Sequence, residues 1–214
     1  MAIKPGLFIG VLCLLAATAS ADSFSFTGTF QTDNDVQLFN FTIAAETTVT
    51  FVTFGFAGGT NAADQVIPPG GFDPEIWLFD PSGNEVASND NGTGAEVGIF
   101  DEAQLDSYLQ QEDLSPGTYT LALTESGNTL VDGLTLGGGF NGGGPFNTAN
   151  CDSNVAFCDF QGDNLDGNWA LDILGADSAS EPGAPVGTPE PGSMVLLSSG
   201  LACFSWVRRR KLSR

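Results

Sequence analysis

Two stretches of the chain gather carboxylate and amide side chains around a glycine. One is the run Asn89-Asp90-Asn91-Gly92, and the other covers residues 163–168, with acids at Asp163 and Asp166. Oxygen atoms of this kind on tight turns suit Ca²⁺, a hard cation that takes about six to eight oxygen ligands. The same residue types also form ordinary turns, in which Asp and Asn accept backbone hydrogen bonds without a metal. Calcium is therefore a candidate cofactor, and turn formation is the alternative.

The second stretch matches part of a known calcium loop. Its oxygen-bearing side chains alternate and are followed by Gly167, as in an EF-hand. The glutamate that closes an EF-hand is missing at the required offset, so we do not expect a true EF-hand. Asp163 and Asp166 are the candidate ligands in this stretch.

Acidic and basic residues occupy different parts of the chain. Among 214 residues there are 26 Asp and Glu, 6 Lys and Arg and no His, which gives a net charge of −20. All six bases lie at the ends: Lys4, Arg208, Arg209, Arg210, Lys211 and Arg214. Clustered acids in the body must therefore be solvated, protonated or bound to a cation, because no basic side chain can neutralise them. A surface adapted to high salt is a further explanation.

This distribution excludes several functions. A body without cationic side chains does not neutralise phosphates, so we expect no nucleic-acid binding. It has no imidazole for a catalytic triad and no lysine for a Schiff base. A glycoside hydrolase needs only two acids about 5–10 Å apart, but among many acids some pair meets that distance by chance. We expect a protein that is not an enzyme, with such a hydrolase as a remote alternative.

The body contains two cysteines, Cys151 and Cys158. In an exported protein they are expected to form a disulfide. A redox or metal-binding thiol pair is the alternative, but the spacing is C-x6-C and no histidine completes a metal site.

The N-terminus has the features of a secretory signal peptide. Residues 1–21 contain one positive residue, an apolar run over residues 7–17 and an A-x-A sequence at 19–21, which predicts cleavage before Asp22. A buried N-terminal helix is the alternative. The prediction is that the chain is exported.

The C-terminus carries a short apolar segment, Ser193 to Val207, followed at once by the bases of residues 208–211. As a helix this segment extends about 22 Å, which is short of a hydrocarbon core about 30 Å thick. A transient transmembrane helix fits this length better than a permanent anchor. The basic tail keeps the C-terminus in the cytoplasm.

Just before that segment stands Pro189-Glu190-Pro191. The proline–glutamate–proline motif, the apolar helix and the basic tail together resemble the PEP-CTERM sorting signal of Gram-negative bacteria, here over residues 189–214. The resemblance implies insertion in the inner membrane, cleavage by an exosortase-type membrane protease, and delivery to the cell surface or the exopolysaccharide matrix. A tail anchor behind a proline-rich linker is the alternative.

Between these ends, residues 22–177 have the length of one domain, and residues 178–188 have the composition of an extended linker. Apolar residues alternate with polar ones in three stripes: Phe24, Phe26 and Phe30; Phe39, Phe41 and Ile43; Val52, Phe54 and Phe56. Period-two patterns with turn residues between them predict an all-β fold, an antiparallel β-sandwich of jelly-roll type. Only residues 101–111 are compatible with a short helix, and the glycines of residues 137–144 predict a flexible loop.

The aromatic stripes are typical of core faces. Trp77 and Trp169 allow another interpretation, in which they are exposed platforms that stack on sugars. A carbohydrate-binding module of the matrix is therefore the alternative function, and solvent exposure of a tryptophan would favour it.

Residues 72–124 resemble the bacterial pre-peptidase C-terminal domains, through the strand and turn ending in Asp80-Pro81-Ser82-Gly83 and the segment Leu114-Ser115-Pro116-Gly117-Thr118-Tyr119. The resemblance implies a non-catalytic exported β-sandwich. Its strand pairing also implies that four side chains come together as a calcium site: Asp80, Asn89, Asp90 and Asp106. The predicted function is a non-catalytic, exported surface or matrix protein that calcium stabilises and exopolysaccharide can bind.

Overall fold

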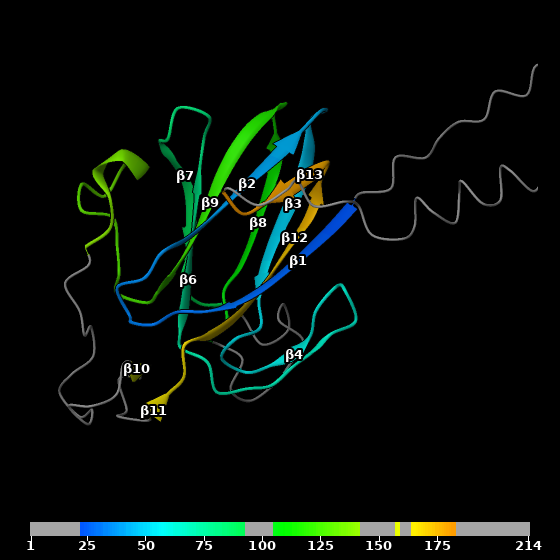
Figure 1. The fold of residues 1–214 in the computed structure, drawn as a ribbon. Helices are drawn as coiled ribbons and strands as arrows, with labels where there is room; N and C mark the ends of the chain where they lie inside the picture. The colour runs from blue at the N-terminus through cyan, green and yellow to red at the C-terminus, as the bar shows by residue number, and fades with distance from the viewer. Residues whose placement is uncertain (1–21, 93–104, 142–156, 159–163, 183–214) are drawn as a thin grey trace, which may run out of the picture.

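Alternating apolar residues build two antiparallel sheets that pack face to face (Figure 1). The computed structural model describes residues 22–92, 105–141, 157–158 and 164–182. The predicted signal peptide and the segment 193–207 lie outside these residues. In the described ranges no helix has the length and apolar character needed to cross a membrane.

Eight strands of five or more residues form the sandwich: β1 (Asp22–Thr29), β2 (Gln37–Ile43), β3 (Thr47–Thr53), β6 (Pro74–Phe79), β7 (Glu85–Asn89), β8 (Tyr108–Leu114), β9 (Gly117–Glu125) and β12 (Asn168–Ala176). Five shorter strands accompany them: β4 (Gly59–Thr60), β5 (Val66–Ile67), β10 (Phe157–Cys158), β11 (Asn164–Leu165) and β13 (Ser178–Ser180). A 3₁₀ turn, η2, covers Leu136–Gly138.

The strand order is that of a jelly roll. One sheet runs β1-β12-β3-β8 and the other β13-β2-β9-β6-β7. With the eight long strands numbered in chain order, these sheets read 1-8-3-6 and 2-7-4-5, the arrangement formed by two interlocked Greek keys. The predicted all-β antiparallel sandwich is confirmed.

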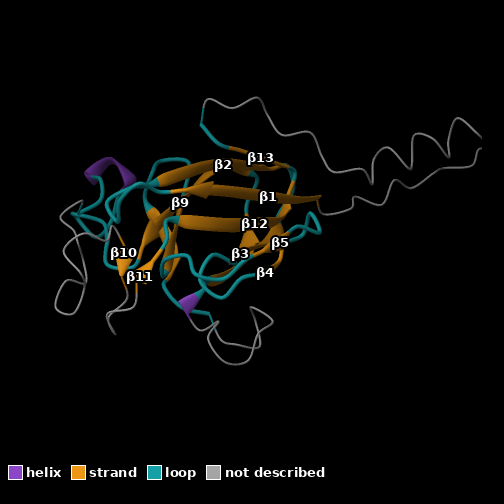
Figure 2. Cartoon of the chain, turned by 60° about the horizontal axis from the view of Figure 1, so that its bottom comes forward, coloured by secondary structure: helices purple, strands orange, loops and turns teal. Residues whose placement is uncertain are grey.

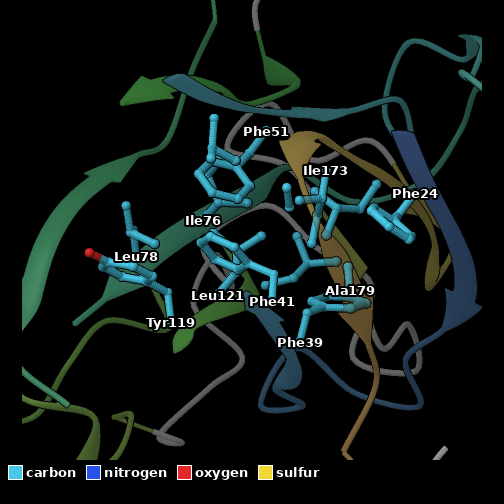
Figure 3. Packing of buried hydrophobic residues seen from close by; sticks show 14 of the residues in the cluster. Phe24, Phe39, Phe41, Phe51, Ile76, Leu78, Tyr119, Leu121, Ile173 and Ala179 are labelled. Carbon is cyan, nitrogen blue, oxygen red and sulfur yellow. The ribbon is translucent and has the colours of Figure 1, made fainter. Parts of the chain in front are cut away.

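The core lies between the two sheets and is rich in phenylalanine (Figure 3). Phe41 of β2 contacts Phe51 of β3 across the sandwich, with ring centroids 5.4 Å apart, and stacks on Tyr119 of β9 at 5.5 Å. Phe39 meets the ring of Trp169 edge-on at 5.7 Å. The predicted stripes of β1 and β2 therefore face the core, because alternate residues of a strand point to the same side.

A second, smaller cluster covers the outer face of the five-stranded sheet. Trp77 and Phe79 of β6 pack there with Ala122 and Leu130, and Leu136 of η2 packs against them. Figure 2 shows η2 beside the end of the sandwich. Part of the segment predicted to be a flexible glycine loop is therefore a cap on apolar side chains.

Two predicted boundaries are wrong, and one ambiguous segment is resolved. In β3 the inward residues are Val49 and Phe51, while Val52 and Phe54 pack together in a small separate cluster. Residues 108–111, which are compatible with either a strand at Tyr108-Leu109 or the end of a short helix, belong to the strand β8, which pairs with β3. Residues 178–180, predicted to begin the linker, form β13 and pair with β2, so the sandwich continues past Asp177.

The two ends of the described sandwich lie together. Asp22 at the start of β1 pairs with Ala176 at the end of β12, two residues before β13 begins (Figure 1). The loop from β1 to β2 lies at the other end, because β1 runs the full length of the sheet before it. Since Gln37 pairs with Leu123, the end of β9 also lies at that far end.

The burial of core residues can be tested by making the same change, Val→Ala, at one buried and one exposed position. Val49→Ala removes two methyl groups from a fully buried side chain, and should lower the free energy of unfolding by about 2 kcal/mol. Val66→Ala makes the same change on β5, where the side chain is 81% exposed, and should cost less than about 0.5 kcal/mol. Urea denaturation measures both, and equal losses would contradict the assigned facing of β3.

Candidate functional site

Asp106 is buried just before β8 and accepts hydrogen bonds from the turn after β3. Its Oδ1 accepts from Thr53 Oγ1 at 2.9 Å and from the backbone N–H of Phe56 at 3.3 Å. Its Oδ2 accepts from the N–H of Ala57 at 2.9 Å. Burial raises the pKa of Asp106, and these hydrogen bonds partly oppose the rise. Both carboxylate oxygens are thus engaged by protein donors.

The neighbouring residue, Ser107, links the segment before β8 to β6 and to the end of β7. Its Oγ lies 2.7, 2.8 and 3.0 Å from the carbonyl oxygens of Pro74, Asn89 and Asp90. The side-chain oxygen of Asn89 accepts from the N–H of Tyr108 at 3.0 Å. Ser107 thus holds the backbone of Asn89 and Asp90 next to the residue after Asp106, whereas the side chains of Asn89 and Asp106 accept from backbone N–H groups. A calcium site formed by Asn89, Asp90 and Asp106 stays a prediction.

Asp80 does not join this group. It lies in the turn between β6 and β7, whereas Asn89 ends β7, so a whole strand separates the two residues. The carboxylate accepts from the N–H groups of Ser82 and Asn84 at 2.8 and 2.9 Å and from Asn84 Nδ2 at 3.0 Å. The bonds from Asn84 above all lower the pKa of Asp80. Its placement in the predicted calcium group is corrected: it forms a turn.

The second predicted group is only partly described. Asp166 accepts from the backbone N–H and from the Nδ2 of Asn168, both at 2.8 Å, which is again turn chemistry. Asp163 and Cys151 lie outside the described residues. The disulfide between Cys151 and Cys158 stays a prediction.

A different set of acids meets at the far end of the sandwich. We define the acidic cluster as Asp33, Asp73, Glu75, Asp90 and Glu125. They come from the β1–β2 loop, the start of β6, the end of β7 and the end of β9, and β6 pairs directly with β9. Asp33, Glu75 and Glu125 are buried.

Burial and the charges of neighbouring acids raise the pKa values of two of these carboxyls, Glu125 and Glu75. Burial, followed by the charges of Asp33, Asp73, Asp90 and Glu75, raises the pKa of Glu125 to about 9. Burial and then the charge of Asp90 raise the pKa of Glu75 to about 7. Glu125 Oε2 and Asp90 Oδ1 are buried and have no hydrogen-bond partner. Across the described ranges, no three acidic, cysteine or histidine side chains form a ready-made metal site.

Of this cluster the sequence prediction contained only Asp90. A signal was present: Glu75 is the one charged residue of β6, whose six residues are all buried. A carboxylate inside such an apolar strand is unusual, because burying a charge costs free energy unless it is compensated. Asp33 and Glu125 gave no such signal, since an acid at a loop or a strand end is ordinary.

The proposed sugar platforms are not available. Trp77 is 7% exposed and donates its indole N–H to Thr124 Oγ1 at 3.1 Å. Trp169 is 5% exposed and packs against Phe30 and Phe39 in the main core. Neither ring presents a face to solvent, so both tryptophans are core residues.

The C-terminal segment follows this domain, and a family model for the PEP-CTERM protein-sorting motif matches residues 188–211. The chain carries a PEP-CTERM sorting motif. The match includes Pro189, Glu190 and Pro191 and the bases Arg208, Arg209, Arg210 and Lys211. The PEP-CTERM motif implies export, transient anchoring in the membrane and processing by an exosortase.

The comparisons say less about the domain that precedes the PEP-CTERM motif. No curated protein matches the chain. The all-β sandwich is consistent with the resemblance of residues 72–124 to pre-peptidase C-terminal domains, and that relationship stays a prediction.

A substitution can show whether Asp106 stabilises the turn after β3 through its hydrogen bonds or binds a metal. Asp106→Ala leaves Thr53 Oγ1 and two backbone N–H groups without their acceptor, so it should lower the free energy of unfolding by about 1–3 kcal/mol. The loss should be equal in EDTA and in Ca²⁺. Glu112→Ala, at an exposed position of β8, is the control and should be nearly neutral. A loss seen only in Ca²⁺ would identify Asp106 as a metal ligand instead.

The raised carboxyl pKa values predict how stability depends on pH without divalent cations. Glu75 and Glu125 rise from 4.5 to about 7 and about 9, so between these values the folded chain binds more protons than the unfolded chain. The free energy of unfolding must then fall as pH rises through this window. Melting temperatures in EDTA should decrease steadily from about pH 5 to pH 9. A flat or rising curve would contradict the burial of these groups.

Proposed function

We propose that this chain is a non-catalytic protein of the cell surface or exopolysaccharide matrix of a Gram-negative bacterium, released from the inner membrane by an exosortase. The observation that carries the proposal is the PEP-CTERM match at residues 188–211, placed directly after a closed β-sandwich. Before release, residues 193–207 hold the chain in the membrane with its basic tail in the cytoplasm. Cleavage near Pro189 then frees the acidic domain.

The geometry of the sandwich supports this order of events. Asp22 begins β1, so removal of the signal peptide before Asp22 leaves the first strand whole. β13 ends at Ser180, ahead of the matched segment, so cleavage near the motif leaves the last strand whole. Both described ends lie at the same end of the domain, so the anchor is joined to the end opposite the β1–β2 loop.

A non-catalytic role is supported by the chemistry of the body. It has no histidine, lysine or arginine. Its most perturbed carboxyls, Glu75 and Glu125, are 9% and 5% exposed, so a sugar cannot reach them as it must reach the acids of a glycoside hydrolase. The burial of Trp77 and Trp169 removes the observation that would have favoured a carbohydrate-binding module.

The sorting role is tested by replacing Pro189 and Glu190 with alanine in the host. Most of the variant should stay unprocessed in the inner-membrane fraction, because the exosortase no longer recognises it. The matched control replaces Pro182 and Pro185, two prolines that precede the matched segment, and should be processed normally. Cell fractionation and immunoblotting report both location and size.

Normal release of the Pro189, Glu190 variant would contradict the proposal. If both variants are retained, the linker rather than the motif is responsible. The matrix assignment has its own measurement: in a strain that makes no exopolysaccharide, the processed protein should move from the matrix fraction to the medium.

A further inference from the structure

Each of the two sheets ends in two edge strands, and an edge strand leaves alternate backbone N–H and C=O groups without a partner in the ladder. The edges are β1 and β8 in one sheet and β13 and β7 in the other. β1 is the longest of the four, with eight residues. Among the described residues it pairs only with β12, beside which it lies in Figure 1. Within the described part of the chain, its outer side is therefore open to another strand.

The other three edges carry features that hinder pairing with a further strand. β8 contains Glu112 and Asp113, and Asp113 has a φ of 53°, in the left-handed region that interrupts a regular strand. β7 is covered by the segment that leads into η2, because the N–H of Glu85 donates to the carbonyl oxygen of Leu134 at 2.8 Å. β13 has only three residues. Charge, irregular backbone, cover and short length are the ways in which natural sheets protect their edges.

β1 lacks this protection. Residues 23–29 contain no charged residue and no proline, and the register with β12 shifts only at the start of the strand, between Asp22 and Ser23. Phe26 is only partly buried, although it packs on the core and its ring centroid lies 4.9 Å from that of Phe39. A regular, uncharged edge beside a partly covered phenylalanine is suited to the addition of a strand.

We propose that β1 is a dimerisation edge: β1 of one copy pairs antiparallel with β1 of a second copy, and the two four-stranded sheets join into one sheet. The partner strand must itself have free backbone groups and carry no charge that repels the acidic domain, and a second β1 meets both conditions. Its one charge, Asp22, stands at the end of the strand. In an antiparallel pair the two Asp22 side chains therefore lie at opposite ends of the joined strands, about 20 Å apart or more.

The symmetry of such a pair limits its register. A twofold axis perpendicular to the sheet keeps the core faces of both copies on the same side, so inward residues lie opposite inward residues. The two registers with the longest overlap pair residues 23–29 or residues 22–28 of the two copies. Phe26 lies opposite Phe26 of the second copy in the first register and opposite Phe24 of the second copy in the other. Either register therefore covers Phe26 with an aromatic ring.

The acidity of the chain determines how this association depends on salt. Two copies with a net charge of −20 each repel one another, whereas the backbone hydrogen bonds and ring contacts of the joined strands carry no net charge. Salt screens the repulsion, so dimers should form at lower protein concentration in about 1 M salt than in dilute buffer. An interface built on ion pairs would show the opposite dependence.

The test is sedimentation equilibrium of the full-length chain in a mild, density-matched detergent. Thr27→Glu adds a carboxylate at an exposed position of β1, and repulsion across the joined strands should raise the dimer dissociation constant about tenfold or more. Thr118→Glu makes the same change at an exposed position of β9, a central strand, and should leave the constant nearly unchanged. Both variants should keep the melting temperature of the wild type, because both positions are on the surface.

Hydrogen exchange of the wild type locates the contact without a variant, because the amides of residues 22–29 should exchange more slowly as the protein concentration rises. A chain that stays monomeric in high salt, or a dimer that Thr27→Glu does not weaken, would overturn the proposal. Exchange in β1 that does not depend on concentration would also overturn it, because another segment of the same chain then covers the edge or another surface forms the dimer. Failure here leaves the sorting proposal untouched, since processing at residues 188–211 is measured separately.

Discussion

The sandwich must bury carboxylates without one basic side chain to pair with them. Wherever an acid leaves solvent, the compensation has to come from backbone N–H groups, hydroxyls, protons or ions of the medium. Asp172 of β12 shows the first solution: it is 2% exposed and accepts from Ser25 Oγ at 2.6 Å and from the N–H of Ala62 at 2.7 Å. Asp106 shows the same solution with three donors. Asp172 and Asp106 thus hold loops against the sheets through hydrogen bonds from hydroxyl and backbone N–H groups.

In the acidic cluster, protein donors do not satisfy every buried carboxylate oxygen: Glu125 Oε2 and Asp90 Oδ1 have no hydrogen-bond partner. β6 and β9 are neighbours, so Glu75, opposite Thr124, and Glu125, opposite Pro74, lie on adjacent strands at one end of the sandwich, and the loops add further acids nearby. Burial and the repulsion between carboxylates both raise the pKa values of Glu75 and Glu125. The stability of the domain thus falls as pH rises through the raised pKa values of Glu75 and Glu125. Carboxylates paired with bases would show the opposite dependence, because stability is then lost as pH falls through their lowered pKa values.

The sequence predicted the fold class and the sorting motif better than it predicted the site. The stripes of β1 and β2 were assigned correctly because phenylalanines alternate through each whole strand. β3 was misjudged because Thr53 ends the strand, so Phe54 and Phe56 continue the pattern in a turn rather than on the core face. The sorting motif was found because it is local, with its residues adjacent in the sequence. The acidic cluster was missed because four segments far apart in sequence form it, and their meeting depends on sheet order.

The same separation explains why Asp80 does not join the segment that contains Asn89 and Asp90. Asp80 and Asn89 are joined by one strand, and a strand keeps its two ends apart by its own length. Asn89 and Tyr108 lie on opposite sides of a long connection, yet a hydrogen bond joins them. Two residues at opposite ends of a strand are therefore far apart in the fold, whereas two residues joined by a loop can lie close together. That rule places the anchored ends of the sandwich at one end and the acidic cluster at the other. The chain leaves the sandwich after Ser180, so the length of the sheets separates that point from the buried carboxyls near Glu125.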